Sequence, residues 1–119
     1  MNALETTVVV TVPHARSYEA PITLERGARV AVLRRDTTWP EWLWCRDAGG
    51  REGWVHQSVL SIEGERATAQ RHYDAIELTA GVDERLRCSE RLGGWTWCIN
   101  EQGQAGWIPE ASLKATEKE

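Results

Sequence analysis

The sequence predicts an all-β protein of two small five-stranded barrels in tandem, packed against each other. Three observations support this prediction. A tryptophan-rich segment occurs twice, the segments between are short β-branched or aromatic runs, and clusters of Gly, Asp or Thr separate these runs. No stretch has the apolar period of a long amphipathic helix. A length of 119 residues allows one ordinary domain or two very small ones, and the repeat decides for two.

The repeat is clearest between residues 40–60 and 93–113, which share Trp, any residue, Trp and Cys, followed by Gly, Trp and an aliphatic residue. The offset grows from 53 residues in this part to 55 further upstream, so two short insertions separate the copies. We therefore predict domains at residues 7–62 and 65–116. The residues matched between the copies include Tyr18 with Tyr73, Trp42 with Trp95, Trp44 with Trp97, Cys45 with Cys98, Gly53 with Gly106, and Trp54 with Trp107.

Runs of strand length occur in order in the first copy: VVVTV, ARVAVL, EWLWC, EGWV and LSI. AGGREG and EQGQAG are typical of hairpin turns. Alternation along a strand predicts that Leu43 and Cys45 face the core and that Trp42 faces solvent, as does its counterpart Trp95. Glu84 aligns with Val30, and because burying an unpaired carboxylate is costly, we expect a local register shift there.

The net charge of -4 would repel phosphate backbones on average, so no nucleic-acid partner is expected. Thr11 and Pro13 interrupt the apolar run near the N-terminus, no basic leader precedes it, and no stretch is long enough to span a bilayer. We therefore expect a cytoplasmic protein without a membrane partner. The three cysteines are expected to be small buried thiols in a reducing environment.

The ordered set of motifs resembles a Src-homology-3 (SH3) domain, and the two copies resemble a tandem of the bacterial variant form. HARSY and AQRHY stand where that family has its ALYDY motif, TLERG and ELTAG where it has ELSFKKG, and GWIPEASL where it has GYIPSNYV. The resemblance covers nearly the whole chain. It implies non-catalytic modules that bind proline-rich or other extended peptides in a shallow aromatic groove.

Carried over position by position, the resemblance implies two groove surfaces. Tyr73, Trp95, Trp107 and Pro109 would form the one in the second copy. Tyr18, Trp42 and Trp54 would form a weaker or altered one in the first copy, where His56 replaces the groove proline.

Two departures from the family pattern make a standard PxxP specificity unexpected. The last groove tyrosine is Val59 in the first copy and Ser112 in the second, and the loop after the ALYDY-like motif is shorter. Carboxylates that this loop normally presents have partial substitutes in Glu19, Asp74 and Glu77, although solvated surface charge is the better explanation for each of these residues.

Other classes of function are less consistent with the sequence. A nucleophile at Cys45 or Cys98 with His56 or His72 as base would need thiols that point out of the core. The histidines, including His14, show no metal-ligand spacing with the cysteines, so neither a metal nor another cofactor is expected. Bacterial relatives that recognise cell walls typically carry an export signal, which is not seen here.

We therefore predict a non-catalytic protein that binds a peptide or extended protein segment, including proline-rich ones. The alternative is a structural assembly adaptor, in which the aromatic surfaces of Trp44, Trp54, Trp97 and Trp107 only pack modules or subunits together. The sequence leaves the ligand's identity and the oligomeric state open.

Overall fold

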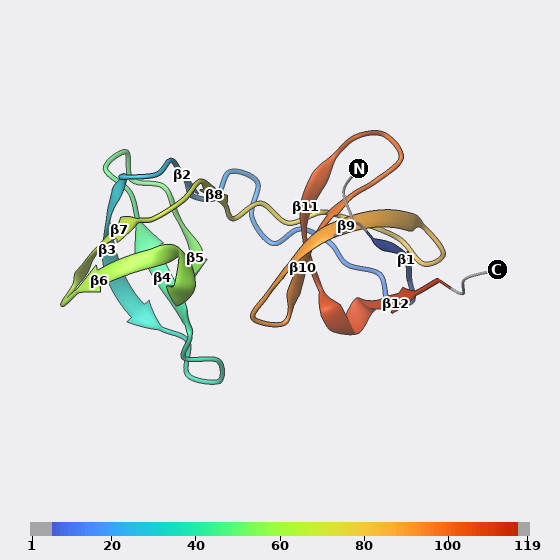
Figure 1. Ribbon diagram of the computed structural model, residues 1–119, viewed down its shortest axis with the longest axis horizontal. Coiled ribbons are helices and arrows are strands. Elements are labelled where there is room, and N and C mark those ends of the chain that lie inside the picture. Colours follow the sequence, from blue (N-terminus) through green and yellow to red (C-terminus); the bar gives the residue numbers. More distant parts are fainter. Residues whose placement is uncertain (1–5, 117–119) are drawn as a thin grey trace. The chain divides into compact units, whose positions relative to one another are not determined.

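The computed structural model describes residues 6–116 and is built from short β-strands (Figure 1). The described residues form two five-stranded sheets, one two-stranded ladder and two single-turn 3₁₀ helices, without an α-helix. This confirms the predicted all-β class, and no helix in the described range is long and apolar enough to cross a membrane. The elements are β1 Thr6–Val10, β2 Thr23–Leu24, β3 Arg29–Arg35, β4 Trp42–Arg46, β5 Glu52–His56, η1 Gln57–Val59, β6 Leu60–Glu63, β7 Arg66–Ala69, β8 Tyr73–Asp74, β9 Arg85–Leu92, β10 Trp95–Ile99, β11 Ala105–Pro109, η2 Glu110–Ser112 and β12 Leu113–Ala115.

The chain forms two compact units that differ from the sequence repeats at residues 7–62 and 65–116. The central unit is Glu19–Ile76, and the terminal unit combines the chain up to Tyr18 with the chain from Glu77 onward. Each unit therefore contains strands from both repeats.

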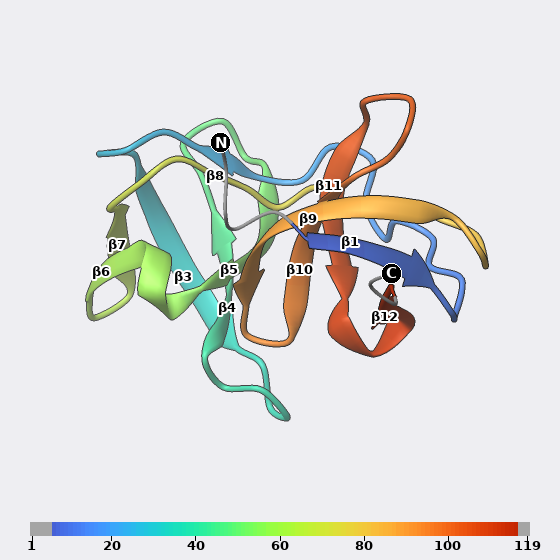
Figure 2. The ribbon, with the colours of Figure 1, turned by 45° about the vertical axis from the view of Figure 1, so that its right-hand side comes forward.

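The sheet of the terminal unit has the order β11-β10-β9-β1-β12. Strand β1, from the start of the chain, pairs antiparallel with β9 and β12, so that Val8 lies opposite Leu86 and Val10 opposite Leu113. Figure 2 shows the blue β1 alongside the orange β9. The first strand of the first repeat thus completes a sheet made otherwise from the second repeat.

The sheet of the central unit has the equivalent order β5-β4-β3-β7-β6. Here β7, the first strand of the second repeat, pairs with β3 and β6, so that Ala67 lies opposite Val30 and Ala69 opposite Leu60. The two repeats have therefore exchanged their first strands. In both sheets two strands remain as edges, so strand pairing alone does not close a complete barrel.

The segments that follow the exchanged strands are also paired within their units. In the central unit β2 pairs with β8, which places Leu24 opposite Tyr73. In the terminal unit His14 and Ala80 form a bridge in which each backbone N–H donates to the other's carbonyl, at 2.9 and 2.8 Å. These ladders satisfy backbone groups where the chain passes from one unit to the other.

The cores consist of the apolar side chains that alternation predicts. Leu43 and Cys45 are fully buried. The expected register shift at Glu84 is confirmed, because β9 begins at Arg85 and Leu86 takes the inward position. Glu84 lies exposed in the preceding turn, where its Oε2 accepts a hydrogen bond of 2.7 Å from the Gly81 N–H. The apolar core of the terminal unit is Val8, Val10, Leu78, Ala80, Leu86, Cys88, Cys98 and Ile108, with Leu113 packed against it.

The repeated glycine of the Gly-Trp-aliphatic motif marks a close backbone approach in each unit. A Cβ added at Gly106 would lie 2.6 Å from the Leu78 nitrogen and 2.7 Å from the Glu77 carbonyl carbon. A Cβ at Gly53 would lie 2.9 Å from Ile22 Cγ2. Because glycine has no Cβ, β5 can lie directly against the segment that contains Ile22, and β11 can lie directly against the segment that contains Glu77 and Leu78.

Removing β1 should prevent the terminal unit from folding. A fragment of residues 65–119 leaves β9 and β12 without their shared partner, so we expect no cooperative unfolding by circular dichroism and poor dispersion in NMR spectra. A permuted chain that joins residues 77–116 through a short Gly linker to residues 6–18 restores the sheet and should fold, since the Thr116 N–H already donates to the Thr7 carbonyl at 3.3 Å. Independent folding of the 65–119 fragment would contradict the strand exchange.

Substituting Gly106 by Ala should destabilise the protein by about 1–3 kcal/mol, because the new methyl group would overlap backbone atoms that cannot move aside. Gly49→Ala is the matched control, since its added Cβ would meet only Asp47 Oδ1 at 3.5 Å. Urea unfolding of both variants gives the comparison. Equal stability of the two would refute the close approach at Gly106.

Candidate functional site

The strand exchange regroups the residues predicted to bind a ligand. Tyr18 lies in the terminal unit with Trp95, Trp107 and Pro109, and Tyr73 lies in the central unit with Trp42 and Trp54. The sequence had assigned each tyrosine to the tryptophans of its own repeat. Each unit therefore contains candidate ligand-binding residues of both repeats.

The terminal surface is defined by Tyr18, His14, Trp95 and Pro109. Trp95 and Pro109 lie opposite each other on β10 and β11, and both are half-buried. The ring of His14 meets Trp95 edge-on, with centroids 5.7 Å apart. Tyr18 is 42% exposed, whereas Trp107 is only 4% exposed and packs edge-on against Trp97 at 5.2 Å. Trp107 is thus buried against Trp97 and is not exposed on this surface.

A buried carboxylate organises the segment that carries His14 and Tyr18. Glu77 Oε1 lies 3.0 Å from His14 Nε2 and accepts hydrogen bonds from the N–H and hydroxyl of Ser17 at 3.1 and 3.0 Å. Glu77 is 9% exposed, so the expectation that it is a solvated surface charge is wrong. The carboxylate instead fixes the ring that contacts Trp95. His14 had been considered only as a metal ligand, and its neighbour in space was not evident from the sequence.

The central surface is defined by Trp42, Trp54, His56 and Tyr73. Its aromatic side chains are more buried than those of the terminal surface. Trp42 is 8% exposed and meets His56 edge-on at 5.0 Å, in the register that Trp95 and Pro109 share in the other unit. The prediction that Trp42 faces solvent is therefore wrong. Tyr73 is 3% exposed, and its hydroxyl donates to the Trp54 carbonyl at 2.8 Å.

A second aromatic pair in the central unit is covered by a cation. Trp44 and Trp54 meet edge-on at 5.0 Å, and the Arg34 guanidinium lies 5.2 Å from each ring. The Trp44 indole N–H donates to Glu52 at 2.7 Å, and this bond, together with Arg46, lowers the pKa of the Glu52 carboxyl. Arg34 thus covers part of Trp54.

The most exposed large apolar side chain in the described range is Trp39, at 61%. It lies in the loop before β4, where Asp36 Oδ2 accepts hydrogen bonds from the Thr38 and Trp39 N–H groups at 3.1 and 2.7 Å. The Trp39 carbonyl in turn accepts from the Trp42 N–H at 2.9 Å. The loop therefore presents this ring beside the central surface. The exposure of Trp39 could not be predicted from the repeat, because Trp39 has no counterpart in the second copy.

The cysteines differ from the prediction of three buried thiols. Cys88 and Cys98 form a disulfide, and only Cys45 is free. Burial raises the pKa of the Cys45 thiol to about 12, so it stays protonated and is a poor nucleophile. In the part of the chain that the structure describes, no three His, Cys, Asp or Glu side chains gather as a metal site would require.

Comparison with known protein families finds that residues 7–63 match the variant SH3 domain. No match was found among curated proteins. The family match supports an SH3-like domain in this chain, and such domains are in general non-catalytic modules of protein interaction. The matched residues include β1, which in the structure pairs with β9 and β12, so the family's first strand is supplied to the other unit.

Acid should weaken the central unit through His56. Burial lowers the pKa of this imidazole against a smaller opposing effect of Glu41. The Nδ1 atom also accepts the Ser58 N–H at 3.2 Å as the cap of η1. The unfolded chain therefore binds the proton first, and stability should fall as the pH drops below the ordinary histidine value of about 6.5.

The comparison of wild type with His56→Gln in urea at pH values from about 7.5 to about 5.5, one unit either side of that value, tests this. The variant should lose less stability across the range. The lowered pKa of Glu52 acts only at more acidic pH, because that stabilisation is lost as pH falls through a pKa below 4.5. An unchanged pH dependence in His56→Gln would show that another group is responsible.

Proposed function

We propose that this protein is a non-catalytic module that binds a peptide or extended protein segment through its aromatic surfaces. The observation that supports this most is the terminal surface, where Tyr18 and Trp95 are accessible and Pro109 and His14 lie beside Trp95. Accessible aromatic rings on a rigid sheet offer large contact area with little loss of side-chain entropy. Proline and aliphatic side chains of an extended segment stack well on such rings.

The two surfaces have different roles in this proposal. The terminal surface is the main one, because Trp95 retains exposure that its counterpart Trp42 lacks. The central surface contributes through the exposed Trp39 and the edge of Trp54, while Trp42 and Tyr73 support it. If one target engages both units of a tandem SH3-like protein, effective concentration raises the overall affinity.

The proposal includes the class of partner and the location. The partner is a protein segment, including proline-rich ones, and neither nucleic acid, membrane, metal nor cofactor is required. We place the protein in the cytoplasm. In that compartment a disulfide is typically transient or redox-sensing.

A structural adaptor is the second candidate, and the burial of three predicted ligand residues favours it. Trp42, Trp107 and Tyr73 are 8%, 4% and 3% exposed, as packing residues would be. Under this alternative the exposed rings Tyr18 and Trp39 bind another folded subunit and not a peptide.

The test is a titration with pooled proline-rich and other extended peptides, followed by tryptophan fluorescence and NMR shift mapping. Trp95→Ala should weaken binding by at least about tenfold, the loss of about 1.4 kcal/mol that defines a significant interface residue. Tyr18→Ala, an exposed site, should also weaken binding without loss of stability. Trp39→Ala, the exposed aromatic of the central surface, should weaken binding less than Trp95→Ala, because the terminal surface is the main one.

Failure of every peptide to shift the terminal surface would contradict the peptide proposal. If Tyr18→Ala and Trp39→Ala then abolish self-association or capture of a folded partner, the adaptor function is the correct one. If Trp95→Ala unfolds the protein while Tyr18→Ala binds peptides normally, the terminal surface is only a packing feature.

A further inference from the structure

The terminal unit contains a disulfide between Cys88 and Cys98, whereas Cys45 in the central unit is free. Cys88 on β9 lies directly opposite Cys98 on β10. In the central unit Cys45 occupies the position of Cys98, but its partner across the strands is Val32. Because the central sheet has the same strand order with a Val–Cys pair, the fold itself does not require the bond. The disulfide is therefore a specific addition to one unit.

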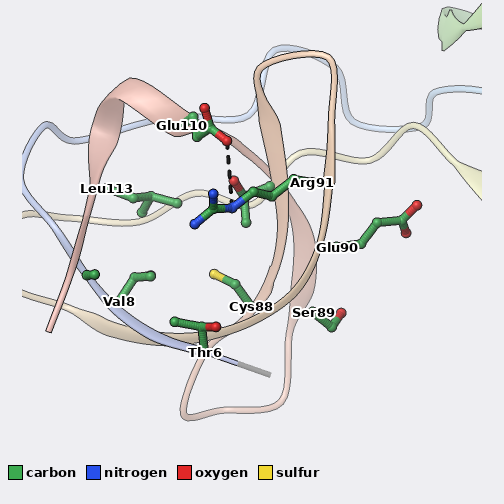
Figure 3. A pocket seen from close by; sticks show the side chains of 10 residues that line it. Thr6, Val8, Cys88, Ser89, Glu90, Arg91, Glu110 and Leu113 are labelled. Atoms are coloured by element: carbon green, nitrogen blue, oxygen red, sulfur yellow. Dashed lines mark ion pairs between the residues drawn. The ribbon is translucent and has the colours of Figure 1, made fainter. Parts of the chain in front are cut away.

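One sulfur of this disulfide borders a cavity. The cavity measures about 230 Å³ and lies between β1, β9, β10, η2 and β12 of the terminal unit. Figure 3 shows the Cys88 sulfur directed toward the space between Val8 and Arg91. Cys98 is fully buried and is not part of the cavity wall. A molecule in the cavity can thus meet Cys88 but not Cys98.

We propose that this cavity admits a small thiol, which reacts with the disulfide at Cys88. The thiolate attacks Cys88 Sγ, forms a mixed disulfide there and displaces Cys98 as a thiolate, which then takes up a proton. A second thiol attacks the mixed disulfide, leaves Cys88 as a free thiol and departs as the symmetrical disulfide of the small molecule. The thiol supplies both electrons, so the exchange needs no other reductant.

The wall of the cavity suits a small thiol. Val8 and Leu113 provide apolar surface for its carbon atoms. The Arg91 guanidinium provides one positive charge for the attacking sulfur, beside the carboxylates of Glu90 and Glu110. Arg91 is held across the cavity by Glu110, with Nε 3.7 Å from Oε2, in an exposed ion pair of the kind that opens readily (Figure 3). Thr96 also lines the cavity, and its buried Oγ1 has no hydrogen-bond partner among the described residues.

The volume sets the size of the reagent. Ligand sites for drug-sized molecules begin at about 300 Å³, whereas an enclosed space of about 150 Å³ holds benzene. A cavity of 230 Å³ therefore fits a thiol of a few heavy atoms and not a folded oxidoreductase.

The reduced state is also accommodated. The Cys98 sulfur lies 3.6 Å from the Thr96 carbonyl, so the released thiol can donate its S–H there. Cys45, the free cysteine at the equivalent position, makes the same contact with the Leu43 carbonyl at 3.7 Å. The central unit thus shows the arrangement that the terminal unit would adopt after reduction.

The experiment treats the oxidised full-length protein with β-mercaptoethanol, quenches with acid and maps adducts by peptide mass spectrometry. Arg87 and Arg91 flank Cys88, so trypsin separates the Cys88 and Cys98 peptides. We expect the adduct on Cys88. Ala115→Phe, on the cavity wall, should slow its formation by about tenfold, whereas Ala111→Phe, an exposed alanine outside the wall, should not.

Each other outcome overturns the proposal. It fails if the adduct forms on Cys98, if Ala115→Phe reacts as fast as wild type, or if all three cysteines of the oxidised protein are free to alkylation in denaturant. Ser89→Phe replaces Ala115→Phe if that variant does not keep the wild-type melting temperature. Cys88→Val, which copies the Val–Cys pair of the central unit, must give no adduct on either remaining cysteine.

Discussion

The pairing of β1 with β9 and β12, and the reciprocal pairing of β7 with β3 and β6, is the interaction on which the rest of the structure depends. Each exchanged strand lies inside its sheet, so its loss would expose two unpaired edges at once. It also brings apolar side chains to the core, with Val8 and Val10 in one unit and Ala67 and Ala69 in the other. Because each unit takes a strand from the other repeat, the folding of either unit requires both repeats to be present. The repeats are thus defined by the sequence, whereas stability depends on the central and terminal units, each of which combines strands of both repeats.

The same exchange determines which side chains share a candidate surface. Tyr18 follows β1 in the chain and lies in the unit that contains Trp95. Tyr73 follows β7 and lies in the unit that contains Trp54. The segments behind these tyrosines are then fixed by different means: Glu77 binds His14 and Ser17 in one unit, and the Tyr73 hydroxyl binds the Trp54 carbonyl in the other. Tyr18 remains 42% exposed in the terminal unit, whereas Tyr73 is 3% exposed in the central unit, so the two tyrosines of the repeat differ in accessibility.

The sequence predicted those features that depend on local pattern. Alternation placed Leu43 and Cys45 in the core, and the cost of burying a carboxylate placed Glu84 outside it. The strand exchange left no local signal, since a strand has the same propensity and alternation whether it pairs within its own repeat or with the other. The pairing of Cys88 with Cys98 could not be predicted from strand alternation, because it depends on a β-bulge. Trp95 pairs with Leu92 and Trp97 with Glu90, a register that would place Cys98 opposite Ser89, but the shift between Trp97 and Cys98 places it opposite Cys88.

The two units have the same strand order but different residues at equivalent positions. These differences indicate which unit responds to pH and which to thiols. Where the terminal unit has Pro109 against Trp95, the central unit has His56 against Trp42, an imidazole whose pKa is lowered by burial. Where the central unit has Val32 opposite Cys45, the terminal unit has Cys88 opposite Cys98, a pair that responds to thiols. Neither difference changes strand order, because each involves one residue of a cross-strand pair whose backbone ladder is unaffected. The residue that responds to protons and the pair that responds to thiols therefore lie in different units, while each sheet still depends on a strand from the other repeat.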